Sequence, residues 1–443
     1  MEKGGSPIVV EGGGEARYGP PPRPRGESTV VAFAVPPIDD PRCLNVRAFH
    51  IKELDKIREG VNAVKNLYDE PYKADPRKFY RVTKRFEHAD TFRGEVHLKY
   101  RTPNVSNAWL KAYEIFVHYG GLLPKEPTEK FTYFDNAAFP GSFLLAAHHM
   151  VATMCHIDNF VWWASSLLSR DEQTGGIRPL EDKYLLYKNY PDHWLMSREN
   201  NGDVTDVANQ RDVEARIGGT VDLYTSDLGF DVSDDFNNQE LAQARANLGQ
   251  IVTGLLVLRE GGSMVTKQYS YFEPFTVSVI GVMTRLFKRV EVCKGMFSKA
   301  GNSETYLVGL GYGRREGDVK ILVDRLARWD EFVGEGGPKP IVTKGCLGEG
   351  FISAIVKSQS VFAEAQVRKI RMVISEYERI VCAGENGGGR NAFTDSNARD
   401  LDLWRRVNPM TPLGEGRGLR VREVLYSGGP SDRGRGKGRG KGR

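Results

Sequence analysis

Short apolar runs that end in a charged residue alternate with longer amphipathic stretches through the middle of the chain. The apolar, aromatic run at 131–134 predicts a buried strand, which ends at Asp135. A turn of small residues closed by Pro140 and Gly141 follows, and the apolar segment 142–154 predicts a helix. A strand, a tight turn and a helix N-terminus bring backbone N–H groups to one place, where doubly wound folds hold a ligand. This turn is therefore the first candidate site.

A second strand-and-helix unit follows the first. The segment VDLYTSDLGFD predicts a strand that runs into Asp227. Apolar residues at steps of three and four then predict a helix that stops at Gly261 and Gly262. The residues of this apolar face are Leu241, Ala244, Leu248, Ile251, Leu255 and Leu258.

Three more strands and a helix complete the pattern. SMVTKQYS predicts a strand that ends at Lys267, and a helix opened by Pro274 follows it. RVEVCKG and ETYLVGLGY predict the last two strands, and Glu304 stands at the start of the second. The alternation of strands and helices predicts an α/β fold with a mostly parallel sheet.

Such a sheet brings chemically useful side chains together. The carboxyl ends of parallel strands lie at one edge, so we expect Asp135, Asp227 and Lys267 to face one crevice. Glu304 precedes its strand, which is typical of a final antiparallel strand that enters from the same edge. A lysine that ends a buried strand is costly unless it is paired or functional.

Regions of different composition flank this α/β domain. The two ends of the chain are rich in Gly and lack the apolar side chains needed for a core. An amphipathic helix is expected over 46–69, and two long helical patterns follow the sheet. The expected divisions are a disordered Gly/Pro-rich arm at 1–29, an N-terminal accessory region at 30–104, the α/β domain at 105–315, a helical appendage at 316–427 and a disordered basic tail at 428–443.

The segment 105–120 predicts a helix with Ser106 as its N-cap. Trp109 and Phe116 share its apolar face, and Lys111 lies about 200° around the helix axis from Trp109. Periodicity alone therefore makes Lys111 a surface residue in solvent.

The connection between the first two predicted strands is long and aromatic. Long connections usually carry a binding function. Trp162 and Trp163 either fill a core patch or form a wall beside an aromatic ligand ring, and Asp203 could accept a hydrogen bond from an exocyclic amine.

Composition narrows the class of protein. The chain has 443 residues, 40% of them hydrophobic, so it can bury a full-sized core. Its five cysteines are scattered without a CxxC pair or a His/Cys cluster, which argues for a reducing compartment and against a disulfide framework or a structural zinc. No apolar run reaches the ~18 residues of a membrane span, and the N-terminus has no signal-peptide core. We expect a soluble, intracellular protein that is not secreted and contacts no membrane.

The net charge of +5 is concentrated at one end of the chain. The tail at 428–443 holds six Arg or Lys and one Asp, so it accounts for the whole of that charge. Such a tail binds phosphate by counterion release, or it serves only as a solubilising extension.

Four of these segments resemble motifs of one family. FDNAAFPGSF resembles the first motif of FtsJ-like, S-adenosylmethionine-dependent RNA 2′-O-ribose methyltransferases. TSDLGFD is similar to their aspartate motif, LVLREGGSMVTKQYS to their Gly-Gly strand and lysine motif, and NSETYLVGL to their Ser-x-Glu-x-Tyr strand. SNAWLKAYEI, WWASSL and NNGDVTD resemble the Adrift-type cap methyltransferase branch, which is found in animals and large DNA viruses. The resemblance covers roughly residues 105 to 312.

This resemblance implies a fold, a cofactor and a set of catalytic residues. The fold is a Rossmann-like methyltransferase sheet whose last strand is antiparallel. The family's Lys-Asp-Lys-Glu tetrad falls on Lys111, Asp227, Lys267 and Glu304. The implied cofactor is S-adenosylmethionine, with S-adenosylhomocysteine as product and no metal. The implied partner is RNA, namely the capped 5′ end of mRNA.

The chemistry suits these residue types. Methyl transfer from a sulfonium to a ribose hydroxyl needs that hydroxyl aligned and deprotonated. Desolvation and a neighbouring cation can lower the pKa of a lysine, so we assign Lys267 as general base beside Lys111. Asp227 and Glu304 would then hold the two amines.

Cofactor contacts are expected along the same edge. A side chain in place of Gly141 would collide with the amino-acid end of the cofactor, and Asp135 could bind its ammonium group. Asp203 and Trp163 are expected near the adenine. The full set of expected cofactor contacts is Asp135, Pro140, Gly141, Trp163, Asp203 and Asp227.

Three functions compete at this point. The first is a cap 2′-O-methyltransferase, with other capping or transcription components as further partners and, if the protein is viral, a place in the virion or the host cytoplasm. The alternatives are a ribosomal RNA 2′-O-methyltransferase and a non-catalytic RNA-binding or polymerase-stimulating subunit with the same fold. A nicotinamide dehydrogenase is disfavoured because the first turn lacks GxGxxG.

Overall fold

The computed structural model describes residues 8–9, 17–18, 29–33, 49–87, 89–124, 126–170, 177–179, 182–229, 237–299, 301–383 and 392–424. The expected basic tail lies outside these residues, as does most of the expected N-terminal arm. Within that arm, β1 (Ile8–Val9) pairs with β2 (Arg17–Tyr18).

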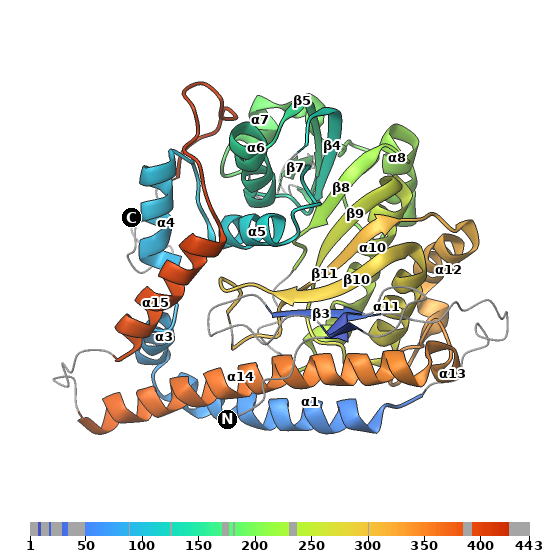
Figure 1. The fold of residues 1–443 in the computed structure, drawn as a ribbon. Coiled ribbons are helices and arrows are strands. Elements are labelled where there is room, and N and C mark those ends of the chain that lie inside the picture. The colour runs from blue at the N-terminus through green and yellow to red at the C-terminus, as the bar shows by residue number, and fades with distance from the viewer. Residues whose placement is uncertain are drawn as a thin grey trace, which may run out of the picture.

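A seven-stranded sheet occupies the middle of the protein (Figure 1). Its strand order is β3-β10-β11-β9-β8-β4-β5. The four strands β5, β4, β8 and β9 are parallel, and β11 runs antiparallel to β9. The expected Rossmann-like sheet with a reversed last strand is therefore confirmed. The strands are β3 (Thr29–Phe33), β4 (Thr128–Asn136), β5 (Ile157–Ser165), β8 (Val221–Ser226), β9 (Leu258–Gln268), β10 (Phe287–Lys294) and β11 (Thr305–Tyr312).

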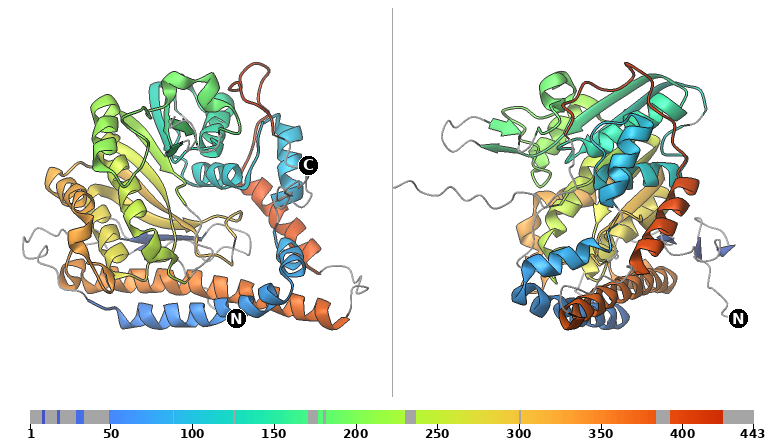
Figure 2. Two further views of the ribbon diagram at one scale, coloured as in Figure 1. Left: turned by 180° about the vertical axis from the view of Figure 1, so that it is seen from behind. Right: turned by 90° about the vertical axis from the view of Figure 1, so that its left-hand side faces the viewer.

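Helices cover both faces of this sheet. Successive residues of each central strand point to opposite faces, so both are buried. Tyr133 and Val265 belong to the core beneath α5 and α6, whereas Phe134 and Met264 belong to the core beneath α8, α10, α11 and α12. The two layers are seen from behind and from the side in Figure 2. The covering helices are α5 (Asn107–His118), α6 (Ser142–Met154), α8 (Val207–Ile217), α10 (Ala244–Val257), α11 (Pro274–Leu286) and α12 (Glu316–Ala327).

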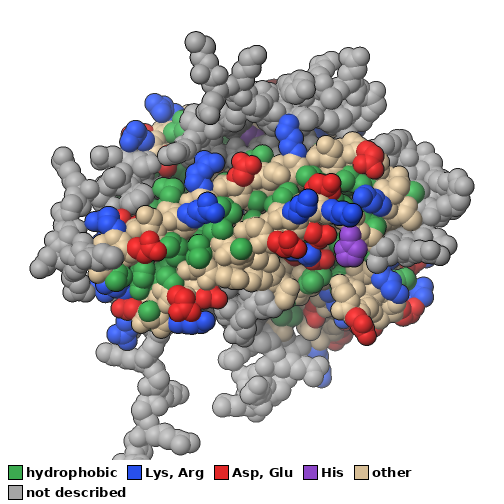
Figure 3. All heavy atoms as spheres, turned by 90° about the horizontal axis from the view of Figure 1, so that it is seen from below, with side chains coloured by type: hydrophobic (Ala, Val, Ile, Leu, Met, Phe, Trp, Pro, Cys, Tyr) green, Lys and Arg blue, Asp and Glu red, His purple; other side chains and the backbone are tan. Residues whose placement is uncertain are grey.

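Helices from both ends of the chain pack beside the sheet. α1 and α14 lie side by side along its lower end (Figure 1). Viewed from below, this face carries hydrophobic side chains among cations and anions in close alternation (Figure 3). Farther along α14, Val373 packs with Phe79, Val82 and Phe86 of the α3 region. These helices are α1 (Lys52–Lys65), α2 (Asp69–Ala74), α3 (Pro76–Lys84), α4 (Ala89–Tyr100), α14 (Glu349–Ala383) and α15 (Ala392–Val407).

Short elements fill the connections. They are η2 (Asn66–Tyr68), β6 (Leu168–Arg170), β7 (Ile177–Pro179), α7 (Leu186–Asn189), η3 (Pro191–His193), α9 (Gln239–Ala242), η4 (Trp329–Phe332), β12 (Val333–Gly334), β13 (Gly337–Pro338) and α13 (Lys344–Leu347).

One element boundary and one whole strand differ from the sequence expectation. The helix expected to reach Gly261 ends at Val257, because Leu258 already opens β9 and is buried there. The aromatic segment around Trp162 and Trp163, for which we expected no strand, lies in β5. The two tryptophans lie next to each other in this strand, so they contact different cores.

Three expectations from composition meet the structure here. The cysteine pattern argued for a reducing compartment and against a disulfide framework; Cys346 is nevertheless disulfide-bonded, whereas Cys155 and Cys293 are free. No helix in the described ranges is long and apolar enough to span a membrane. Within the same ranges, no group of three or more His, Cys, Asp or Glu side chains could hold a metal ion.

Two helical glycines should respond in opposite ways to a methyl group. A Cβ added at Gly249 in α10 would lie 2.1 Å from the backbone oxygen of Val204, whereas nothing lies within 4 Å of one added at Gly60 in α1. We therefore expect Gly249→Ala to lower the free energy of unfolding by about 1–3 kcal/mol. Gly60→Ala should raise it by about 0.5–1 kcal/mol through helix propensity. Urea unfolding measures both changes, and a stabilising Gly249→Ala would contradict the close packing of α10 on residues 203–205.

Candidate functional site

Four chain segments bring the expected tetrad together at one edge of the sheet. Asp227 follows β8, Lys267 lies near the end of β9, Glu304 stands just before β11, and Lys111 lies in α5. The Lys267 ammonium nitrogen Nζ is 3.2 Å from the Asp227 carboxylate oxygen Oδ1, and Lys111 Nζ is 2.6 Å from Glu304 Oε1. The structure thus places the four residues in two lysine–carboxylate pairs.

Lys111 corrects the periodicity argument, which made it a solvated surface residue. Its side chain is only 13% exposed, because this face of α5 packs against the loop between β10 and β11. One turn later on the same helix, the Glu114 carboxylate accepts hydrogen bonds from the Met296 backbone N–H at 3.0 and 3.1 Å. The face that seemed free from its spacing is therefore fastened to the hairpin that carries Glu304.

Three further residues support the tetrad, and the sequence reasoning missed them. Tyr306 donates its hydroxyl to Asp227 Oδ1 at 2.9 Å, and Ser298 donates to Glu304 Oε1 at 2.8 Å. Lys294, at the end of β10, donates to both oxygens of Asn302 at 3.0 Å and to the Glu304 backbone oxygen at 2.6 Å. Tyr306 is the tyrosine of the segment NSETYLVGL, so the resemblance of that segment to a family motif was the available signal. Nothing in the sequence marked Ser298 or Lys294.

The ionisation of Lys267 differs from expectation. Burial by itself would lower its pKa, but the nearby Asp227 carboxylate, with Tyr269 and Glu304, raises the pKa above its usual value. The expected net lowering of the pKa is therefore not found, because the attraction of these groups for the charged amine outweighs the effect of burial. A Cβ added at the neighbouring Gly229 would lie 2.8 Å from Lys267 Nζ, so the lysine is held against the backbone there.

The pKa values of Glu304 and Lys294 are shifted downward, opposite to that of Lys267. Burial would raise the pKa of Glu304, but Lys111, Lys267 and Lys294 together hold it well below its usual range. Burial lowers the pKa of Lys294 to about 7, with Lys111 adding to the effect and Glu304 opposing it. A neutral amine has only two hydrogens, so loss of the proton from Lys294 would break one of its three hydrogen bonds.

Asp135 lies deeper than the tetrad. It is 1% exposed, and its carboxylate accepts from the Thr225 hydroxyl at 2.8 Å and from the Leu144 backbone N–H of α6 at 3.2 Å. Burial raises its pKa to about 8, with the Thr225 hydrogen bond opposing and Asp227 adding to the shift. Asp135 therefore fixes the start of α6 against β8.

The last residue of the turn between β4 and α6, Gly141, has no room for a side chain. Gly141 has φ of +112°, and a Cβ there would lie 2.2 Å from the Leu186 side chain. Pro140 precedes it, and Ser142, which opens α6, accepts a hydrogen bond from the Ser106 hydroxyl at 2.7 Å. The N-termini of α5 and α6 are thus joined beside this turn.

The two other expected cofactor residues lie farther along the same edge. Trp163 is half-buried near the end of β5 and packs against the core below α10. Asp203 accepts hydrogen bonds from the backbone N–H and the hydroxyl of Thr205, both at 2.8 Å, in a loop whose Gly202 packs against the backbone of Ser166 just after β5. The Asp203 carboxylate is therefore partly occupied by its own loop.

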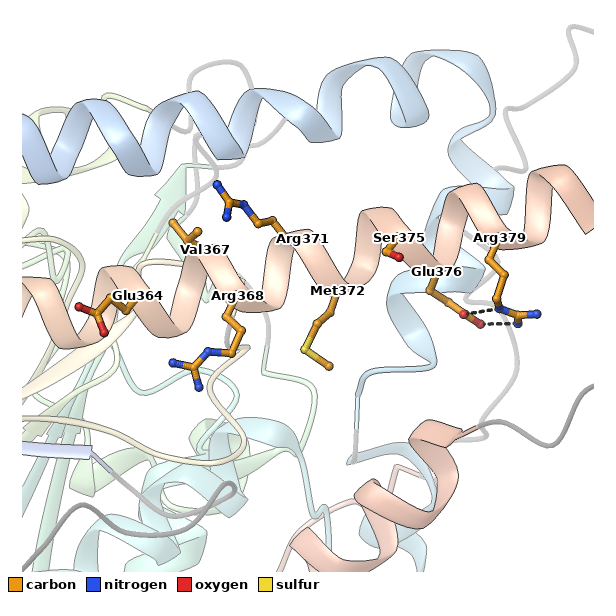
Figure 4. A pocket seen from close by; sticks show the side chains of 8 residues that line it. All are labelled: Glu364, Val367, Arg368, Arg371, Met372, Ser375, Glu376 and Arg379. Carbon is orange, nitrogen blue, oxygen red and sulfur yellow. Dashed lines mark hydrogen bonds and ion pairs between the residues drawn. The ribbon is translucent and has the colours of Figure 1, made fainter. Parts of the chain in front are cut away.

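A separate hollow of about 650 Å³ lies along α14 and contains no tetrad residue (Figure 4). All of its lining residues belong to that one helix, and Arg379 within it is paired with Glu376 at 2.8 Å. It is distinct from the edge of the sheet described above.

Known proteins resemble this chain over the same region. Residues 104–312 match the family of FtsJ-like methyltransferases. A probable methyltransferase of African swine fever virus is 35% identical over 263 residues, which are 56% of this chain and 59% of that protein. The cap-specific mRNA (nucleoside-2′-O-)-methyltransferase 2 of Drosophila melanogaster is 25% identical over 317 residues, covering 69% of this chain and 42% of that protein. The chain thus spans less than two thirds of the length of these relatives.

The sheet with its reversed β11, the order of the four motifs and the match over residues 104–312 agree with one another. Residues 104–312 of this chain are therefore similar to the FtsJ-like methyltransferases in fold, motif order and sequence.

Proposed function

We propose that this protein transfers a methyl group from S-adenosylmethionine to a ribose 2′-hydroxyl of RNA, at the cap-proximal nucleotide of mRNA. The observation that carries the proposal is the pair of buried lysine–carboxylate contacts, Lys267 with Asp227 and Lys111 with Glu304. They place two amines at the edge of the sheet where a ligand of this fold lies. The name of the Drosophila relative supports RNA as the substrate class.

The residues at this edge suit a sulfonium cofactor. The side chain of Asp227 is 21% exposed and offers a carboxylate to a positive charge, whereas the space beside Gly141 is filled by the Leu186 side chain. Asp135 is less suited to bind an ammonium group directly, since it is buried and already hydrogen-bonded. Asp203 and Trp163 would lie toward the adenine. When bound, the cofactor supplies an activated methyl group that needs no metal.

The tetrad would orient the hydroxyl and remove its proton. Lys267, as a neutral amine, accepts the proton of the 2′-hydroxyl, and Lys111 stabilises the oxygen as negative charge develops on it. Asp227 and Glu304 hold the two amines, while Tyr306 fixes the Asp227 carboxylate. In the resting protein the raised pKa of Lys267 keeps it protonated, so it must first lose a proton to solvent.

Removal of the Lys267 amine should greatly slow methyl transfer. We expect Lys267→Ala to reduce the rate of methyl transfer about 10³-fold. Lys267→Arg should reduce that rate equally, because a guanidinium is not deprotonated in proteins. The measurement is radiolabelled methyl transfer onto matched RNAs with and without a cap, followed by nuclease mapping of the modified ribose. Lys288→Ala, an exposed lysine at the far end of β10, is the matched control and should leave the rate unchanged.

The same assay separates the competing functions. A wild-type chain that retains RNA but transfers no methyl group would support a non-catalytic subunit instead. Equal transfer to capped and uncapped RNA would argue for a different RNA target, such as ribosomal RNA. Full activity of Lys267→Ala would exclude Lys267 as the base.

The rate of transfer should rise with pH. Because Asp227 holds the pKa of Lys267 above its usual value, the neutral fraction of the amine increases about tenfold per pH unit through the neutral range. We expect the single-turnover rate to follow this increase between about pH 6 and 9 without levelling off, and the residual rate of Lys267→Ala to lack it. A plateau near pH 7 would point to a base with a lower pKa and would contradict the assignment.

A further inference from the structure

The outer face of α3 carries a compact set of cations around an aromatic ring. Residues 76–85 include five Arg or Lys and no acidic residue. Four side chains fall within about 100° of the helix circumference, and we name them the α3 ridge: Arg77, Tyr80, Arg81 and Lys84. Tyr80 is 49% exposed, and Lys84 Nζ lies 5.4 Å from the centre of its ring.

The opposite face of the same helix explains why the ridge points to solvent. Phe79 and Val82 are buried against Val373 of α14, so α3 cannot turn its cations inward. In the described part of the chain, no acidic side chain pairs with Arg77 or Arg81. Lys84 and Arg85 are paired with Glu87 and Glu376, so the local excess of positive charge on this helix rests on Arg77 and Arg81.

The α3 ridge is connected to the tetrad by a chain of contacts. Lys84 contacts Glu87 at 3.2 Å, and Glu87 contacts Lys299 at 2.8 Å. Lys299 is 58% exposed and lies next to Ser298, whose hydroxyl binds the carboxylate of Glu304. The loop that ends at the catalytic carboxylate is therefore fastened to the ridge.

We propose that the α3 ridge binds the backbone of single-stranded RNA on the 3′ side of the reacting nucleotide. Arginines bind phosphate oxygens in a forked geometry, and an exposed tyrosine offers a platform on which a base stacks without regard to sequence. Lys299 lies between the ridge and the tetrad, on the route that the strand would take. The inference rests on the proposed function, because it assumes that an RNA ribose occupies the tetrad.

The test compares capped RNAs of different length. Wild-type protein should have a lower KM for a capped RNA of about twenty nucleotides than for one of about four, because only the longer strand reaches the α3 ridge. The double variant Arg77→Glu and Arg81→Glu should raise the KM of the long RNA about tenfold while leaving kcat and the short RNA unchanged. Tyr80→Ala should raise the KM of the long RNA by a similar factor, because a base can no longer stack on the ring.

Salt dependence and a control variant make the test specific. Loss of two phosphate contacts should reduce the slope of log affinity against log salt by about 1.4 for a single strand. Lys320→Glu, a single charge reversal at an exposed cation on α12, is the control for charge alone and should leave the KM of the long RNA unaltered. Melting temperatures check that each variant is folded.

Three results would overturn the inference. The first is an unchanged KM for the long RNA in the double variant. The second is an equal rise in the KM of the short RNA in that variant. The third is an equal rise in the KM of the long RNA in Lys320→Glu. The first would also be the outcome if the ridge docks an acidic protein segment instead. Failure of the proposed function looks different: wild-type protein would methylate neither RNA, yet fluorescence anisotropy with uncapped single-stranded RNA would still report whether the ridge variants bind more weakly.

Discussion

The architecture of the site depends on pairing two lysines with two carboxylates inside a largely buried edge. Lys267 and Glu304 are 11% and 10% exposed, and each needs an opposite charge from a different part of the chain. Removing one partner of a buried pair leaves an uncompensated charge, which costs about 3–5 kcal/mol. The positions of α5, β8, β9 and the β10–β11 hairpin are thereby linked, because a shift of any one of them would separate a pair.

The sequence sufficed to predict strands β4, β8, β9, β10 and β11 and three of the four tetrad positions. Strands that are apolar on both faces are buried on both faces, so the runs around Phe134, Tyr224 and Met264 indicated central strands and placed Asp227 and Lys267 at their ends. Lys111 required the family resemblance. Its helical face looks solvated from spacing alone because periodicity contains no information about a hairpin that arrives from residues 295–303.

Other features could not have been derived from pattern. The direction of the pKa shift of Lys267 depends on which charge lies nearest, and a spacing rule does not supply that distance. The contacts of Lys294 and Ser298 with Glu304 depend on how the loop between β10 and β11 folds. Trp162 and Trp163 were expected in a binding connection, yet their alternating burial belongs to a strand whose β-branched content is low.

The pairing of β3 with β10 has a practical consequence for work on this molecule. The family match begins at residue 104, but residues 29–33 supply the outermost strand of the same sheet. A fragment trimmed to the family boundaries would leave the backbone N–H and C=O groups of β10 bare along one side. Such an open border is a template for another polypeptide, so the shortened protein would be prone to self-association even with its four tetrad residues present.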